Sequence, residues 1–342
     1  MRRSRLYLLG VSLLIVVLAA LPVLQVADFA ITLITQMFIL SIAAMGLDIL
    51  VGYTGLVSFA QGAFFGIGAY AIAVATTEMG ITNFFVLMVG ALVLVTLVAA
   101  VFGLLALRAS GVGFIIVTLA LNELVWGLAY QWVSVSGGDN GITGFSRPVI
   151  GPLNFGSDYT FYYLALFFLV ASALALYLIV RSPFGLVLRG IREGPKRMRA
   201  LGYNIWLYRY IAFVIAAFFG GVGGTMIAYY NLFVSTSTAN LAQSTQFLIM
   251  TILGGTGTLF GSLLGSGIIV TLTNVLSNYT QRWELILGAI YVAIVIWAPG
   301  GIVGFVHRRR TSPAMATPRN LDASSQSDTP SDDLETHGKS SL

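Results

Sequence analysis

The sequence lacks cysteine and contains little histidine and little charge. The absence of cysteine in its 342 residues excludes disulfide bonds and thiolate metal sites. The two histidines, His307 and His337, lie at or beyond the last apolar stretch, so no metal centre or histidine acid–base centre is expected within the apolar part of the chain. Charged residues make up 9% and hydrophobic residues 57%, too few charges to cover a soluble globule of this length. Most of the chain is therefore expected to lie in a membrane.

Motifs of nucleotide-binding and hydrolytic enzymes are also missing from the sequence. There is no P-loop, no G-x-S-x-G elbow and no H-E-x-x-H pair. We therefore expect neither a catalytic site nor a bound cofactor in this chain. The net charge of +5 is not taken as a sign of nucleic-acid binding, because the basic residues are distributed as membrane topology requires.

Long apolar stretches organise the chain, each near the roughly 20 residues that a helix needs to cross a bilayer. The stretch 244–276 is too long for one ordinary span, and its middle, Gly254–Gly261, is rich in glycine and poor in helix formers. We expect two short segments broken at that sequence and about ten membrane segments in total, which makes the fold class all-α and polytopic. The stretches are 7–27, 29–51, 55–77, 84–107, 113–133, 160–180, 208–230, 244–276 and 283–305.

Basic residues orient these segments across the membrane. The arginines among the first five residues predict a cytoplasmic N-terminus, and alternation then predicts that Arg108 and residues 181–207 are cytoplasmic as well. The loops 134–159 and 231–243, which hold a single basic residue between them, are expected outside. The basic cluster at 307–310 is also expected to be cytoplasmic, which requires an even number of crossings.

Two regions of different composition divide the chain. Residues 1–306 are expected to form one transmembrane domain, and residues 307–342, which are rich in Ser, Thr, Asp and Pro, a disordered cytoplasmic tail. The N-terminal arginines followed by Leu6–Ala20 mimic a signal peptide. No clear small-residue cleavage site follows, so we interpret this stretch as a retained first helix.

A basic segment, Ser182–Gly202, interrupts the apolar pattern. Together with the preceding Arg181 it holds six of the eighteen Lys and Arg residues and a single acid, Glu193. Because the surrounding sequence is apolar, this segment is the surface most available to a partner in water.

The end of this basic segment predicts a short helix. Pro195 suits a first helical position, and Gly202 suits a C-terminal cap. Met198 and Leu201 fall three residues apart on one face, with basic residues around the rest. An amphipathic helix at this place predicts a docking element.

Two glycine-rich sequences in different halves of the chain are similar. Gly52-Tyr-Thr-Gly55 matches Gly254-Gly-Thr-Gly257. Paired glycine-interrupted segments point to an inverted repeat around a central transport path, which makes Gly254, Gly255 and Gly257 candidates to line it. The match is short, so chance similarity is an equal alternative.

Small and polar residues also cluster after the first of these glycine sequences. Gly62, Gly66 and Tyr70 fall on one helical stripe that allows close helix approach, and Ser58 and Gln61 add hydrogen-bonding groups beside it. Structural packing and a role in lining a path are equal alternatives for this cluster.

Glu123 is the only acid well inside a predicted span, whereas Asp48 is expected at a membrane interface. A carboxylate at membrane depth is costly unless it is protonated, paired or facing a wet cavity. Glu123, with Asn122 beside it, could meet a cationic group of a solute, or it could fix the packing of two helices. In a stand-alone secondary transporter, Glu123 would carry a proton.

Four segments in a specific order carry a family resemblance. They are Gly52–Tyr70, Arg108–Gly144, Ser182–Gly202 and Met250–Gly265, with a closing Pro299–Ile302. Together they resemble the LivM-like inner-membrane permease subunits of branched-chain amino-acid (Liv-type) ABC importers, over about residues 45–305.

The resemblance implies a multi-pass subunit of the cell inner (plasma) membrane with both termini cytoplasmic. The implied partners are a second, LivH-like permease subunit, two cytoplasmic ABC ATPase subunits and a periplasmic or external solute-binding protein. The solute would be a branched-chain amino acid moved by the partners' ATP hydrolysis. Many relatives have a histidine-containing variant of Ala60-Gln61-Gly62, so urea or a short amide is the alternative solute.

The resemblance also assigns the segment 182–202 to the family's ATPase-docking loop, although Gly194–Arg197 departs from the usual polar, acid-containing run. The docking residues are expected to be Arg192, Glu193, Pro195, Met198, Ala200, Leu201 and Gly202.

Overall fold

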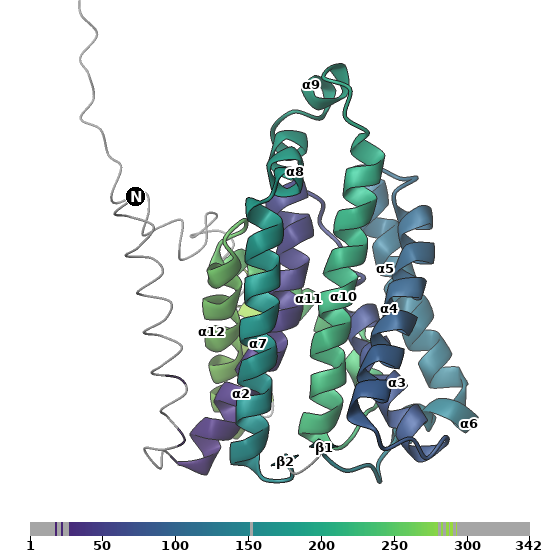
Figure 1. Ribbon diagram of the computed structural model, residues 1–342, viewed down its shortest axis with the longest axis vertical. Coiled ribbons are helices and arrows are strands. Elements are labelled where there is room, and N and C mark those ends of the chain that lie inside the picture. Colours follow the sequence, from purple (N-terminus) through teal and green to yellow (C-terminus); the bar gives the residue numbers. More distant parts are fainter. Residues whose placement is uncertain are drawn as a thin grey trace, which may run out of the picture.

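The computed structural model describes residues 27–150 and 153–279, together with a few isolated residues on either side. The expected stretches 7–27 and 283–305 and the expected tail 307–342 fall almost wholly outside the described residues. Within these residues the chain is a bundle whose long helices run roughly parallel to one another (Figure 1). The bundle confirms the prediction of a helical chain.

Six helices are long and apolar enough to cross a membrane, and two shorter apolar helices accompany them. The predicted total of about ten segments stays a prediction, because its first and last members lie outside the described part of the chain. The long helices are α2 (Asp28–Asp48) continued by the π-helical η1 (Ile49–Thr54), α4 (Phe84–Ala106), α5 (Val112–Gln131), α7 (Asp158–Arg181), α10 (Ile205–Asn231) and α12 (Leu259–Tyr279). The shorter ones are α3 (Gln61–Thr77) and α11 (Leu241–Gly254).

α3 begins later in the sequence than predicted. The apolar stretch 55–77 predicted one helix, but η1 ends at Thr54, the following Gly55 has a φ of +74° that favours glycine, and residues 55–60 are not helical. α3 therefore has only 17 residues, about 26 Å at 1.5 Å per residue, against the roughly 30 Å of a hydrocarbon core.

The break predicted within 244–276 is confirmed. α11 ends at Gly254 and α12 begins at Leu259. Between them, Gly255 and Gly257 have φ values of +110° and +83°, which other residues rarely adopt. Two helices therefore replace one long span because the intervening glycines form a turn.

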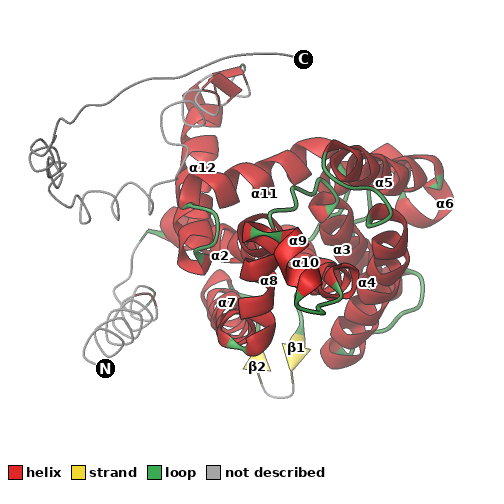
Figure 2. Ribbon diagram, turned by 90° about the horizontal axis from the view of Figure 1, so that it is seen from above, coloured by secondary structure: helices red, strands yellow, loops and turns green. Residues whose placement is uncertain are grey.

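α10 is the central helix of the bundle and packs against α2, α3 and α4 (Figure 2). Its glycines allow close approach: a Cβ added to Gly224 would lie 1.9 Å from the Phe65 oxygen of α3, and one added to Gly68 would lie 2.6 Å from the Gly221 oxygen. Small residues at helix contacts are typical of membrane bundles, in which van der Waals packing holds helices together.

Short elements occupy the two ends of the bundle (Figure 1). One end carries α8 (Pro183–Glu193) and α9 (Pro195–Ala200). The opposite end carries α6 (Val133–Ser136), η2 (Gly138–Asn140), η3 (Thr236–Ala239) and an antiparallel pair of two-residue strands, β1 (Val149–Ile150) and β2 (Leu153–Asn154). We call these the α8–α9 end and the β1–β2 end. The basic segment and the loops predicted to lie outside are thus at opposite ends, as alternation requires.

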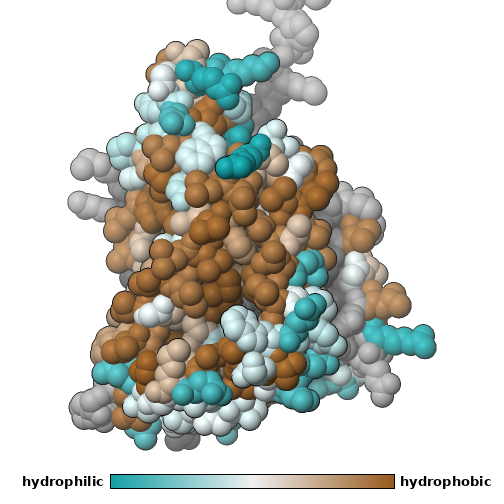
Figure 3. Space-filling view, turned by 90° about the vertical axis from the view of Figure 1, so that its right-hand side faces the viewer, coloured by the Kyte–Doolittle hydropathy of each residue, from teal (hydrophilic) through white to brown (hydrophobic). Residues whose placement is uncertain are grey.

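An apolar belt separates hydrophilic residues at the two ends (Figure 3). α4 and α5 contribute large exposed apolar side chains to the surface of the bundle. A water-soluble protein rarely exposes so much contiguous apolar surface, whereas lipid or a partner helix covers it well. These side chains include Phe85, Val89, Val93, Leu97, Val101, Ile116, Leu124 and Leu128.

Candidate functional site

The basic segment forms two helices, where the sequence predicted one. α9 begins at Pro195 as predicted, and Gly202 follows it with a φ of +86°. The longer α8 was missed, although Pro183 at its start and the spacing of its buried Val187, Leu188 and Ile191 are helix signals. Its short apolar run was hidden among glycines and arginines.

α8 and α9 have a small apolar cluster of their own. Val187 and Ile191 of α8 pack with Ile205 at the start of α10, and Met198 of α9 packs against them. The predicted face shared by Met198 and Leu201 is wrong, because the helix ends at Ala200 and Leu201 is 72% exposed. The cluster makes the α8–α9 pair a compact projection at its end of the bundle.

Charge on this projection is exposed and has no acidic partner. Within the described residues the only ion pair is at the opposite end of the molecule, and Glu193 forms none with its basic neighbours. An unpaired basic surface raises the local potential and attracts acidic partners. The exposed residues are Arg192, Glu193, Pro195, Lys196, Arg197, Arg199, Ala200, Leu201 and Gly202, whereas Met198 is half-buried.

The two similar glycine sequences lie in direct contact. A Cβ added to Gly52 would lie 2.2 Å from the Gly257 nitrogen. The Tyr53 hydroxyl donates to the Gly257 oxygen at 2.9 Å, and the Gly257 N–H donates to Asp48 Oδ1 at 2.8 Å. Asp48 is fully buried within the protein, and its expected position at a membrane interface stays a prediction. Of the candidate path glycines, Gly257 is thus at a junction of two broken helices.

The candidates Gly254 and Gly255 lie in the same turn region. A Cβ added to Gly254 would lie 1.9 Å from the Gly261 oxygen, so this glycine permits α11 and α12 to meet. The Gly255 N–H donates to the Thr251 oxygen at 3.2 Å and closes the end of α11. Both glycines are held against protein backbone.

Gln61 and Ser58 lie at the buried start of α3. The Gln61 amide donates to the Ala43 oxygen of α2 at 2.9 Å and to the Ala216 oxygen of α10 at 3.1 Å. The Ser58 hydroxyl accepts from the Ala60 N–H at 3.2 Å. Gln61 therefore joins three helices, and both side chains satisfy backbone groups that are removed from water.

Gly62 belongs to a buried polar network that the sequence did not predict. Its N–H donates to Ser244 Oγ at 2.7 Å, and Ser244 donates to Asn122 Oδ1 of α5 at 2.9 Å. The Asn122 amide then donates to the Ala239 oxygen at 3.1 Å. The detectable signal was the polar pair Thr118 and Asn122, four residues apart on an apolar helix. Ser244 is far away in sequence and gave no such signal.

Glu123 is close in sequence to this network but separate from it. Its side chain is partly exposed, and among the described residues nothing forms a hydrogen bond or an ion pair with it. α5 is also the least buried of the six long helices. The alternative in which Glu123 fixes helix packing within the described part of this chain therefore has no contact to support it.

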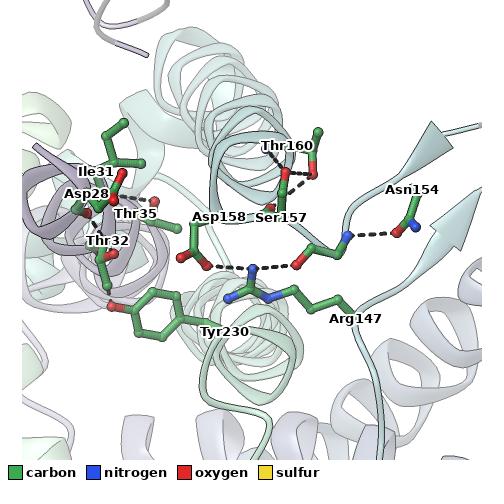
Figure 4. Close-up of polar contacts among 11 residues, drawn as sticks. Asp28, Ile31, Thr32, Thr35, Arg147, Asn154, Ser157, Asp158, Thr160 and Tyr230 are labelled. Carbon is green, nitrogen blue, oxygen red and sulfur yellow. Dashed lines mark hydrogen bonds and ion pairs between the residues drawn. The ribbon is translucent and has the colours of Figure 1, made fainter. Parts of the chain in front are cut away.

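The β1–β2 end holds a second polar cluster, drawn in Figure 4. Arg147 pairs with Asp158 of α7 at 2.7 Å, donates to the Gly156 oxygen at 3.2 Å and lies 5.0 Å over the Phe161 ring. Beside it, the Tyr230 hydroxyl of α10 donates to the Thr32 oxygen of α2 at 3.1 Å (Figure 4). The Arg147 contacts fix the hairpin loop to α7, and the Tyr230 bond joins α10 to α2 at the same end.

No metal cluster accompanies these sites. The residues that the structure describes contain no group of three or more His, Asp or Glu side chains placed to hold a metal ion.

Known proteins with similar sequences are membrane permeases. The high-affinity branched-chain amino acid transport system permease protein LivM of Salmonella typhimurium is 29% identical over 88% of this chain and 75% of its own length. The protein of the same name in Escherichia coli is 28% identical over 84% of this chain and 73% of its own. A guanosine ABC transporter permease, NupQ of Bacillus subtilis, is 31% identical over 24% of each chain.

A family pattern covers most of the chain. Residues 29–296 match the family described as the permease component of the branched-chain amino acid transport system. No solved structure matches this chain. Six apolar helices and relatives that are transport permeases indicate a multi-pass membrane protein. The chain belongs to the branched-chain amino acid transport permease family.

Proposed function

We propose that this chain is the membrane-spanning subunit of an ATP-driven importer for branched-chain amino acids or a related small polar solute. It has no catalytic site of its own in this proposal. Two cytoplasmic ATPase subunits hydrolyse ATP, a second permease subunit completes the path, and an external binding protein delivers the solute. The termini and the α8–α9 end are cytoplasmic.

The observation that carries the proposal is the exposed basic α8–α9 projection on a member of this permease family. It has its own apolar cluster, so it retains its shape while its charged face remains free. A compact basic projection suits docking to an acidic groove on an ATPase. The docking residues are those of the 182–202 segment named from the sequence.

The exposed face of α5 is our candidate for the solute path. Glu123 lies there without a partner in the described chain, and an intramembrane carboxylate is costly unless it meets water, a cation or a donor. The ammonium group of an amino acid, or a group on the second permease subunit, would supply that partner. The Asn122–Ser244 hydrogen bond holds α5 on its buried side.

Reconstitution tests the proposal. The chain is placed in liposomes with a second permease subunit, ATPase subunits and a binding protein of the same operon, and uptake of leucine, urea and guanosine is compared with ATP present and absent. We expect ATP-dependent uptake of leucine. Proton-driven uptake by the chain alone would contradict the importer and favour a stand-alone transporter.

Glu123→Gln tests the path. If the carboxylate meets the solute ammonium, loss of a charge-assisted hydrogen bond raises the KM for leucine by about tenfold. The control is Glu78→Gln, the same change at an exposed residue after α3, which is expected to leave KM unchanged. Equal KM values for both variants and the unaltered chain would remove Glu123 from the path.

A further inference from the structure

Arg192 of α8 reaches both glycine turns of the membrane bundle. Its Nη1 donates a hydrogen bond to the Gly52 oxygen. A Cβ added to Gly257 would lie 3.4 Å from Arg192 Nη1, and one added to Gly55 would lie 3.3 Å from Arg192 Cγ. One side chain from the projection therefore touches the end of η1 and the turn between α11 and α12.

The two turns are also fastened to each other. Asp48 accepts from the Gly257 N–H, and Tyr53 donates to the Gly257 oxygen. A second arginine of α8, Arg189, lies 5.2 Å over the Tyr53 ring. The Asp48 carboxyl and the Arg192 guanidinium therefore approach the same residue of this turn, Gly257.

The turns lead onward to the candidate path. The Gly257 turn ends α11, and Ser244 on α11 holds both Gly62 of α3 and Asn122 of α5. Every step in this chain of contacts is a hydrogen bond or a rigid helix. Such contiguous contacts are able to carry a displacement from one site to another.

We infer that Arg192 is the positioning residue through which the α8–α9 projection moves the two glycine turns, so that α8, η1 and the 255–258 turn shift as one body. The inference rests on the proposed function, because a docked ATPase supplies the displacement. Arg192 thereby has a role inside the bundle in addition to its place in the docking segment.

The first test compares Arg192→Gln with Arg181→Gln in the reconstituted complex. Both variants lose one positive charge near the same end, but Arg181 stacks on Tyr177 of its own helix, at 4.5 Å. Because Arg192 also belongs to the docking segment, leucine uptake is counted per ATP hydrolysed by the ATPase subunits that remain bound, and we expect this ratio to fall at least about fivefold in Arg192→Gln. If leucine uptake per ATP hydrolysed by Arg192→Gln were within twofold of the value for Arg181→Gln, the inference would be overturned.

The second test replaces the contact covalently. The chain has no cysteine, so Arg192→Cys combined with Gly55→Cys introduces the only two thiols, which a short reducible bifunctional reagent can join. Cross-linking is expected to restore the uptake per ATP that Arg192→Cys loses, and reduction to abolish it again. Gly55→Cys alone is the control for the substituted turn.

The outcomes distinguish a concerted movement of α8 and the glycine turns from other roles of Arg192. If cross-linking leaves the low ratio unchanged or lowers it further, α8 and the turns do not move together and the inference is wrong. If the unaltered chain shows no ATP-dependent uptake at all, the proposed function fails and the inference fails with it.

Discussion

At the β1–β2 end of the bundle, Arg147 is 13% exposed and paired with Asp158, whereas at the α8–α9 end the side chains of Lys196, Arg197 and Arg199 are exposed and without an acidic partner in the described chain. The first arginine fastens a loop to α7. Of the other three side chains, Arg197 donates one long hydrogen bond, at 3.5 Å, to the Glu193 oxygen of the same projection. The difference indicates that charge maintains this chain's own structure at one end and is available to a partner at the other.

Attachment to the bundle differs between the ends in the same way. The β1–β2 end is tied down by several side chains, including Tyr159, whose hydroxyl donates to Asp28 Oδ1 at 2.6 Å. The projection contacts the bundle through its small apolar cluster, through Leu188, which is buried in the main core, and through the glycine turns that Arg192 touches. Its attachment is therefore largely apolar, whereas polar side chains hold the other end.

The largest expected effect concerns the glycine turns beneath the projection. Gly52→Ala would place a Cβ 2.2 Å from the Gly257 nitrogen and 2.3 Å from Asp48 Oδ1, so backbone must shift. We expect a loss of roughly 3 kcal/mol in the free energy of unfolding, measured by thermal unfolding in detergent. The control is Gly90→Ala on α4, where an added Cβ meets nothing within 4 Å. Equal midpoints for the two variants would show that the turns do not pack as described.

Neutralising the free charges sharpens the comparison at the α8–α9 end. Lys196, Arg197 and Arg199 changed together to Gln should weaken ATPase binding at least about tenfold, or about 1.4 kcal/mol. Stability should change by less than about 0.5 kcal/mol, because these side chains are exposed. The affinity of the unaltered chain should also fall more steeply with salt than that of the variant. A destabilised variant, or unchanged affinity, would assign these charges to the fold.

The smallest effect is expected at the β1–β2 end. Arg147→Gln should lower the free energy of unfolding by about 1 kcal/mol, since a partly exposed ion pair and one hydrogen bond are lost. Combining it with Asp158→Asn should cost less than the sum of the two single changes. ATPase affinity is the matched readout and should remain unchanged. If the costs of the two single changes simply added, the ion pair would contribute little to the free energy of unfolding.

Local sequence signals predicted much of the fold. Long apolar runs predicted the six long helices within a few residues, because the hydropathy of a span is a property of consecutive residues. The signal for the turn at Gly255 and Gly257 was equally local, since positive φ favours glycine. The prediction that the stretch 55–77 is helical from its first residue was wrong, because small apolar residues fit helix and extended chain alike. Hydrogen bonds from the backbone to Thr118 and Ser244 determine where α3 begins.

The sequence by itself determined that this chain belongs in a membrane, which of its described stretches are long and apolar enough to cross it and where one of them breaks, because hydropathy and glycine backbone freedom act over short distances along the chain. Only the tertiary structure decided that Gly52 meets Gly257, that Arg192 reaches both turns, and that Glu123 lies partly exposed beside the buried Asn122. Those facts depend on how helices pack and rotate against one another. Residues two hundred positions apart come together through that packing, and no local pattern encodes it.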